Sequence, residues 1–328
     1  MKHRHLGIGL TGLGVMFLLG NMLGLEAWAQ TGYPNKPMEY VCQASAGGAS
    51  DAFVRQVAIM FQQEKIISVP IVVVNKPGGS GAIAFGYTAQ KAGNPFYLMN
   101  TSGNFIATPV EKPKVPGYKD FTPIALLAMD QNAIAVNANS SFKSVKDLVE
   151  AAKKKPKDIK WGGSSIGSQD HLTMYLLQKS AKCDFNYISF TAENETMAAL
   201  LGGHIDVGCF NPRTILGQVE ANKLRIVGLS SEKRLPHLTN VPTLAEMGYP
   251  VLTPMQRGVV MPKGVSDEAK NYWISAYKKL IKTSAWKKYI ADNVLSEEGL
   301  FGDDYFKFLV AETEKQRGIM KELGLIKQ

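Results

Sequence analysis

The alternation of apolar segments, small-residue loops and amphipathic segments constrains the fold of this chain more than any other feature of its sequence. Met38 to Gln43 has the composition of a buried strand, and residues 44–50 form a loop of Ala, Ser and Gly. Asp51 then begins a segment whose apolar residues recur at the spacing of one helix face. The same order returns at residues 70–91. Such alternation predicts a parallel α/β sheet with these loops at the carboxyl ends of its strands.

A second α/β unit follows the first along the chain. Strands are expected at 159–162, 187–190 and 205–210, and the loop 163–168 again consists mainly of small residues before a predicted helix. Ligands of open parallel sheets bind outside the carboxyl ends of the strands. Two units of this kind therefore predict a ligand-binding cleft.

The first 29 residues have the pattern of a secretory signal peptide. Lys2 to His5 is basic, Leu6 to Leu25 is mostly apolar, and Ala27-Trp28-Ala29 supplies a cleavage pattern. An uncleaved membrane anchor is the alternative, but the glycines in this segment weaken it as a spanning helix. We therefore expect residues 1–29 to be removed and the mature protein to lie outside the cytoplasm.

The charge of the chain is positive but not concentrated. The formal net charge is +9, and a basic surface attracts anions in general. The densest run, Lys153-Lys154-Lys155, ends a predicted helix just before Pro156, where cations are favoured by the helix dipole. The scattered lysines thus do not indicate a nucleic-acid partner.

Signatures of enzymes, cofactors and metals are weak. Gly79 to Ala84 matches the dinucleotide pattern G-x-G-x-x-A, but no Asp or Glu lies between Lys65 and Val110 to bind a ribose. Gly163-Ser164-Ser165-Ile166-Gly167 has the spacing of the G-x-S-x-G motif, but Asp170 and His171 are adjacent on the predicted helix and so point in different directions. The histidines lack the spacing of a metal site. We expect no enzyme activity, no cofactor and no metal.

The three cysteines, Cys42, Cys183 and Cys209, cannot all pair within one chain. Cys42 and Cys209 lie in strand-like apolar segments, so we expect buried thiols there. A disulfide between Cys183 and Cys209 remains an open alternative.

The small-residue loops offer backbone N–H groups and hydroxyls, which suit the capture of a carboxylate at a helix N-terminus. Simple turn formation is the alternative explanation for any single loop. The candidate ligand-binding residues are Ser45, Ala46, Gly47, Thr101, Ser102, Ser164, Ser165, Ser168, Thr191, Ala192, Asn211 and Arg213.

Two charged residues near these loops have two interpretations each. Asp51 is either a ligand contact or, as we predict, a helix-start acid that fixes the first loop through backbone N–H groups. Arg213 is either a bidentate partner for a ligand carboxylate, which would favour a diacid, or a surface arginine paired with Glu193 or Glu195.

Six motifs, in order along the chain, resemble those of the substrate-binding proteins of tripartite tricarboxylate transporters, the Bug-type periplasmic receptors. They are Ala46-Gly47-Gly48-Ala49-Ser50-Asp51, Asn75-Lys76-Pro77-Gly78-Gly79-Ser80-Gly81, Lys119-Asp120-Phe121-Thr122-Pro123-Ile124, Ser164-Ser165-Ile166-Gly167-Ser168 with His171-Leu172, Leu200-Leu201-Gly202-Gly203-His204-Ile205-Asp206, and Lys223-Leu224-Arg225 with Val241-Pro242-Thr243.

The resemblance implies a two-lobed α/β fold of the periplasmic-binding-protein type (type II-like), with crossing strands and a ligand cleft between the lobes. Lobe one would comprise residues 30–129 and 231–328, and lobe two residues 130–230. The resemblance also implies a periplasmic monomer that binds an aliphatic or aromatic organic acid and delivers it to membrane permease subunits. A ligand sensor for a regulatory partner and an exported hydrolase are the alternatives.

The chain departs from the family pattern at positions that would face the ligand. The family usually has Pro where this chain has Gln43 and Ala46, and often has Tyr-Lys-Gly where this chain has Phe190-Thr191-Ala192. Glu193 and Glu195 follow that segment. These departures concern the identity of the ligand rather than the fold.

Overall fold

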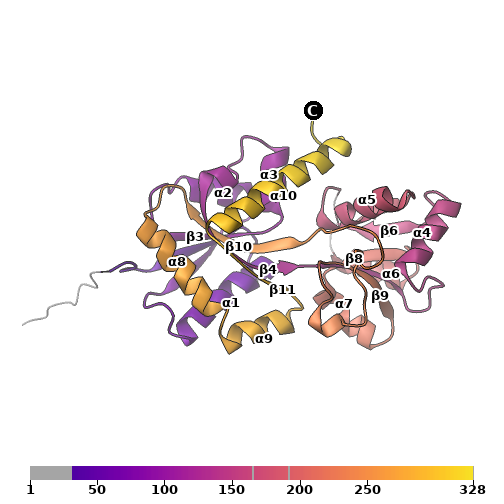
Figure 1. Ribbon diagram of the computed structural model, residues 1–328, viewed down its shortest axis with the longest axis horizontal. Helices are drawn as coiled ribbons and strands as arrows, with labels where there is room; N and C mark the ends of the chain where they lie inside the picture. Colours follow the sequence, from indigo (N-terminus) through magenta and orange to yellow (C-terminus); the bar gives the residue numbers. More distant parts are fainter. Residues whose placement is uncertain (1–31, 165, 191–192, 328) are drawn as a thin grey trace, which may run out of the picture.

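The computed structural model describes residues 32–327 except 165, 191 and 192. Within these residues two mixed sheets, each covered by helices, form two lobes that lie side by side (Figure 1). This arrangement confirms the expectation of a two-lobed α/β fold. The expected signal peptide, residues 1–29, lies outside the described part of the chain.

Lobe one is built on a six-stranded sheet of the described residues, in the order β11-β4-β10-β3-β1-β2. Its strands are β1 (Met38–Cys42), β2 (Ile71–Asn75), β3 (Tyr97–Thr101), β4 (Phe121–Asp130), β10 (Met255–Pro262) and β11 (Ser296–Phe301). Its helices are α1 (Ala49–Gln63), α2 (Ala82–Ala89), α3 (Asn104–Glu111), α8 (Asp267–Leu280), α9 (Ser284–Asp292) and α10 (Asp303–Glu322).

Lobe two is built on a five-stranded sheet, again counted over the described residues, in the order β7-β6-β8-β5-β9. Its strands are β5 (Asn132–Asn137), β6 (Lys160–Gly163), β7 (Asn186–Ser189), β8 (Val207–Phe210) and β9 (Leu224–Ser230). Its helices are α4 (Val145–Lys154), α5 (Gln169–Ala181), α6 (Glu193–Leu201) and α7 (Pro212–Glu220).

The predicted parallel pairing holds for only part of each sheet, because each sheet also contains strands that run the other way. β1 pairs in parallel with β2 and β3, but β10 is antiparallel to β3 and β4. In lobe two β6 is parallel to β7 and β8, whereas β5 is antiparallel to β8 and β9. The reason is connectivity: β5 and β10 are the strands by which the chain enters each lobe from the other, so no crossover helix sets their direction.

Both faces of each sheet are packed against helices. The predicted apolar face of α1 is buried, with Phe53 and Phe61 at most 1% exposed, beside Trp273 of α8 and Trp286 of α9. Burying one such aromatic side chain contributes roughly 2–3 kcal/mol. Helices α2, α3 and α10 cover the opposite face, where Tyr305 is a fully buried member of a second cluster. The helices thereby fix the orientation of the loops that precede them.

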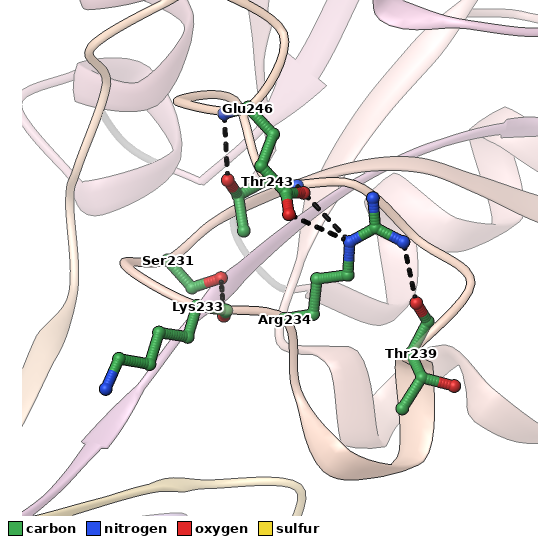
Figure 2. Close-up of polar contacts among 6 residues, drawn as sticks. All are labelled: Ser231, Lys233, Arg234, Thr239, Thr243 and Glu246. Atoms are coloured by element: carbon green, nitrogen blue, oxygen red, sulfur yellow. Dashed lines mark hydrogen bonds and ion pairs between the residues drawn. The ribbon is translucent and has the colours of Figure 1, made fainter.

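The chain crosses between the lobes twice. Gln131 connects β4 to β5, and residues 231–254 connect β9 to β10. Polar contacts within the longer crossing order it (Figure 2): Arg234 Nε lies 2.9 Å from Glu246 Oε2, and the Glu246 N–H donates to Thr243 Oγ1 at 3.1 Å. The Thr243 N–H donates in return to Glu246 Oε2 at 2.8 Å. This segment is therefore a defined connection although it contains little regular structure.

The three cysteines are free thiols, so the Cys183–Cys209 disulfide left open above is not formed. Cys42 and Cys209 are buried, as predicted, and burial raises the pKa of both thiols. Among the described helices, none has the length and apolar character needed to cross a bilayer.

Candidate functional site

A cavity of about 330 Å³ lies between the lobes. Lobe one, lobe two and both crossings contribute to its wall, which consists of Gly103, Asn104, Ala107, Gln131, Asn132, Ser164, Gly167, Ser168, Gln169, Asp170, Leu172, Glu193, Asn211, Leu252, Thr253, Pro254, Met255, Glu312, Lys315, Gln316 and Ile319. A volume of this size suits a small organic molecule. We call it the interlobe cavity.

A second cavity of about 250 Å³ lies in lobe one, at the carboxyl ends of β1, β2 and β3. Its wall consists of Gln43, Ala44, Ser45, Ser50, Pro77, Gly78, Ser80, Gly81, Ser102 and Asn104. Because Asn104 lines both cavities, the two are adjacent. The first two predicted small-residue loops therefore meet beside the interlobe cavity.

Asp51 fixes the loop between β1 and α1. Its Oδ2 accepts from the Gly47 N–H at 2.9 Å and from Arg55 Nε at 3.0 Å, and its Oδ1 accepts from Asn75 Nδ2 at 2.8 Å. The Arg55 guanidinium lowers the pKa of this carboxyl to about 2. Asp51 is 3% exposed and lines neither cavity, so its contacts are those of a residue that holds the loop.

The ends of β1 and β3 are tied together by side-chain amides. Gln43 Nε2 donates to Ser102 Oγ, and the Gln43 N–H donates to Asn100 Oδ1 at 3.1 Å. Ser102 thus lines the lobe-one cavity with its hydroxyl already engaged. The Thr101 hydroxyl instead shares a 2.7 Å hydrogen bond with Tyr305 and lies away from both cavities.

The loop between β6 and α5 is fastened by the first turn of α5. Asp170 Oδ2 accepts from the Ser164 N–H at 2.9 Å and from the Ser164 hydroxyl at 2.6 Å. Neutral His171, whose pKa is lowered by burial, accepts the Gly167 N–H on Nδ1 at 3.1 Å. Ser168 caps α5 and lines the interlobe cavity. Burial raises the pKa of Asp170.

Glu193, the first residue of α6, brings a second carboxyl to the lobe-two wall. Its Oε1 accepts from the Asn211 N–H at 2.6 Å and from the Thr214 hydroxyl at 2.9 Å. Asn211 in turn caps α7 by accepting the Arg213 N–H at 3.0 Å. Burial raises the pKa of Glu193, and the nearby charges of Asp170 and Asp130 raise it further.

A buried ion pair joins the end of β4 to the start of β10, where the chain passes between the lobes. Asp130 and Arg257, 3% and 4% exposed, contact each other through Oδ2 and Nη2, and Arg257 Nη1 donates to Ser50 Oγ at 3.0 Å. Sequence reasoning missed Arg257, although a single charge within an apolar strand was a usable signal. Through Ser50, the pair connects the ends of these two strands to the start of α1, directly after the loop between β1 and α1.

The structure divides the predicted ligand-binding residues into three groups. Those that line one of the two cavities are Ser45, Ser102, Ser164, Ser168 and Asn211. Those that lie elsewhere are Ala46, Gly47, Thr101 and Arg213. Those outside the described residues are Ser165, Thr191 and Ala192.

Arg213 is exposed at the start of α7. Its charge lies near Tyr289 of α9, where it opposes the rise of the phenol pKa, which burial brings to about 12. A role for Arg213 in ligand binding stays a prediction. In the part of the chain that the structure describes, no group of three or more His, Cys, Asp or Glu residues is arranged to hold a metal ion.

Several wall residues carried no usable signal in the sequence. Glu312, Lys315 and Gln316 belong to α10, whose polar residues resemble an ordinary solvent-exposed helix face. Gln131 and Asn132 stand between two strand-like segments, where a turn was the simpler interpretation. Only the packing of α10 and the crossing of β4 into β5 bring these residues to the cavity.

The chain matches a protein-family model over residues 53–325, and that family is described as "Tripartite tricarboxylate transporter family receptor". Among curated proteins it is similar to the Cupriavidus necator "UPF0065 protein in gbd 5'region". The two are 28% identical over 341 residues, which cover 100% of this chain and 99% of the relative.

Solved structures share the fold. A TctC solute binding protein from Polaromonas has a TM-score of 0.80 and 25% identity, over 88% of this chain and 99% of that protein. The R. palustris protein Rpa4515, solved with adipate, has a TM-score of 0.74 and 23% identity, over 89% of this chain and 98% of that protein.

Proposed function

The chain belongs to the tripartite tricarboxylate transporter receptor family of solute-binding proteins, and on this premise we propose that it captures a small organic carboxylate and delivers it to a transporter of that type. The observation that carries the proposal is the interlobe cavity, whose wall is formed by both lobes and both crossings. A ligand in this position contacts both lobes at once, so binding would favour their closure.

The helix N-termini at the cavity support an anionic ligand. α5 begins at Gln169 behind its cap Ser168, and α3 begins at Asn104, and all three residues line the cavity. Helix N-termini present unpaired N–H groups and a partial positive charge to anions. The adipate bound to Rpa4515 supports the same class of ligand.

We propose that the ligand contacts come from Ser45, Ser102, Ser164, Ser168 and Asn211, together with Ser165, Thr191 and Ala192, which lie outside the described residues. The two crossings, at Gln131 and at residues 231–254, support lobe boundaries near 130 and 230. The protein acts as a binding protein rather than an enzyme, in the periplasm, and its partners are the permease subunits of the transporter.

Isothermal titration calorimetry with two- to eight-carbon carboxylates tests the proposal. One acid should bind with one-to-one stoichiometry and be recovered unchanged after prolonged incubation. Failure of every carboxylate to bind, or conversion of the bound acid into a product, would contradict it. Loss of uptake of that acid on deletion of the gene, restored by the wild-type gene, checks the link to transport.

A further inference from the structure

The lobe-two wall of the interlobe cavity is acidic. Asp170 and Glu193 both line the cavity, and Asp130 lies close enough for its charge to act on Glu193. Asp130 is paired with Arg257. Among the described residues, neither Asp170 nor Glu193 has a salt bridge. The wall therefore has an excess of negative charge.

The hydrogen bonds of these two carboxyls do not neutralise them. Asp170 accepts from the backbone and hydroxyl of Ser164, and Glu193 accepts from Asn211 N–H and the Thr214 hydroxyl. All of these donors are uncharged. A buried carboxyl without a cation is costly to ionise, and the raised pKa of both groups reflects this cost.

A neighbouring side chain adds an independent observation. Gln131 is 4% exposed and lines the same cavity, and its Nε2 donates to Ser296 Oγ at 2.9 Å. Its Oε1 is buried and has no hydrogen-bond partner in the described structure. Buried acceptors are normally paired, so this oxygen is available to a donor.

We propose that the ligand is an amino acid in the broad sense: a small carboxylate that also carries an ammonium group, with the nitrogen against Glu193 and Asp170. This inference rests on the proposed function and names the ligand class for the same cavity. An ammonium group supplies three donors and the positive charge that the wall lacks. A second carboxylate in that position would meet two like charges.

The opposite wall suits the carboxylate end of such a ligand. Lys315 of α10 lines the cavity there, with Nζ 2.9 Å from the Leu252 carbonyl oxygen and 3.4 Å from Glu312 Oε1. The start of α3, at Gly103 and Asn104, adds the N–H end of a helix to the same side. Lobe one thus contributes Lys315, which Glu312 shares, and the start of α3, whereas lobe two contributes two carboxyls without a salt bridge among the described residues.

Pairs of ligands that differ only in one terminal group test this directly. The pairs are succinate and β-alanine, glutarate and γ-aminobutyrate, and adipate and δ-aminovalerate, titrated alongside α-amino acids and their deaminated counterparts. Calorimetry should show at least one ammonium-bearing acid binding at least about tenfold more tightly than its partner, the ratio expected from one charge-assisted contact.

Glu193→Gln keeps the shape of the side chain and removes its charge. It should weaken the ammonium-bearing ligand about tenfold and leave the matched diacid no weaker. Glu195→Gln, on the same helix but exposed and outside both cavities, is the control and should change neither.

Tighter binding of diacids to the wild type, or equal weakening of both members of a pair by Glu193→Gln, would overturn the inference and leave the proposed function standing. If no acid of any kind binds, both fail. The comparison of ligand pairs on the wild type needs no variant, so a folding defect in Glu193→Gln cannot hide the result.

Discussion

The first loop of each lobe is built on the same plan but has the opposite electrostatic character. In lobe one Asp51 holds the Gly47 N–H, and in lobe two Asp170 holds the Ser164 N–H. Arg55 lies 3.0 Å from Asp51, whereas Asp170 has only uncharged donors among the described residues. The pKa of Asp51 is accordingly lowered and that of Asp170 raised.

The difference shows that the local geometry of these loops and their charge are set separately. A carboxyl in the first turn of the helix is sufficient to fix a small-residue loop, because its oxygens accept backbone N–H groups. The cation that stabilises the charge of Asp51 is a separate residue, Arg55, on the next turn of α1. Lobe one thus completes the pairing internally, and lobe two leaves a charge at the cavity.

The largest expected effect is on stability, at Asp51. Asp51→Ala removes three hydrogen bonds, one of them to Arg55, and should lower the free energy of unfolding by about 2–3 kcal/mol. Urea denaturation at neutral pH measures it. Asp304→Ala, an exposed acid in the first turn of α10, is the matched control and should have far less effect. Unchanged melting with abolished ligand binding would instead make Asp51 a ligand contact.

The next effect is a pair of opposite pH dependences. The pKa of Asp51 in the folded protein is about 2, against an ordinary 3.8. The ionised carboxylate therefore stabilises the folded state above pH 3.8 by up to about 2 kcal/mol, and this stabilisation is lost as the pH falls toward 2. The raised pKa of Asp170 gives the reverse: its contribution is complete below pH 3.8 and is lost as pH rises through the folded pKa.

Unfolding of wild type, Asp51→Asn and Asp170→Asn across pH 2–7 separates the two cases. The difference in unfolding free energy between wild type and Asp51→Asn should grow with rising pH, and the difference between wild type and Asp170→Asn should shrink. Parallel curves for the two variants would show that the charge environments of the loops are alike after all.

A smaller effect is expected on ligand affinity, at one serine of each loop. Ser45 lines the lobe-one cavity, and no described residue hydrogen-bonds its hydroxyl, so Ser45→Ala should weaken binding by about 0.5–1.5 kcal/mol. The Ser164 hydroxyl already donates to Asp170 at 2.6 Å, so Ser164→Ala should weaken binding less. Calorimetry with the tightest-binding carboxylate measures both effects. A larger loss of affinity for Ser164→Ala than for Ser45→Ala would mean that the ligand replaces Asp170 as the acceptor of the Ser164 hydroxyl.

The smallest effect concerns the contact between the lobes. Glu322 at the end of α10 lies 2.7 Å from Lys179 Nζ and accepts from the Tyr175 hydroxyl at 3.1 Å, both on α5 of lobe two. The side chains of Lys179 and Glu322 are exposed, so Glu322→Gln should leave the melting temperature unchanged. It should slightly increase the radius of gyration measured by X-ray scattering without ligand, unlike Lys321→Gln on the same turn. A change in melting alone would contradict this role.

The sequence was sufficient to predict the parts of the cleft that local patterns encode. The loops before α1 and α5 were predicted from small residues between an apolar segment and a helix start, and this local chemistry holds in the structure. Lys315 could not be predicted, because its place at the cavity depends on α10 packing on lobe one more than two hundred residues from Asn104. Arg257 stands out in the sequence as a single charge in an apolar strand, but its pairing with Asp130 depends on β10 entering between β3 and β4.

That placement of β10 has a consequence for the order in which the protein can form. The lobe-two sheet uses strands from one continuous stretch, Asn132 to Ser230, so all of its strands have been made before β10 is synthesised. The lobe-one sheet is interrupted between β3 and β4 until β10, which begins at Met255, has been made. Its strand pairing therefore spans most of the chain, which slows folding. The part of the protein made first is completed last, which suits a chain expected to be exported before it folds.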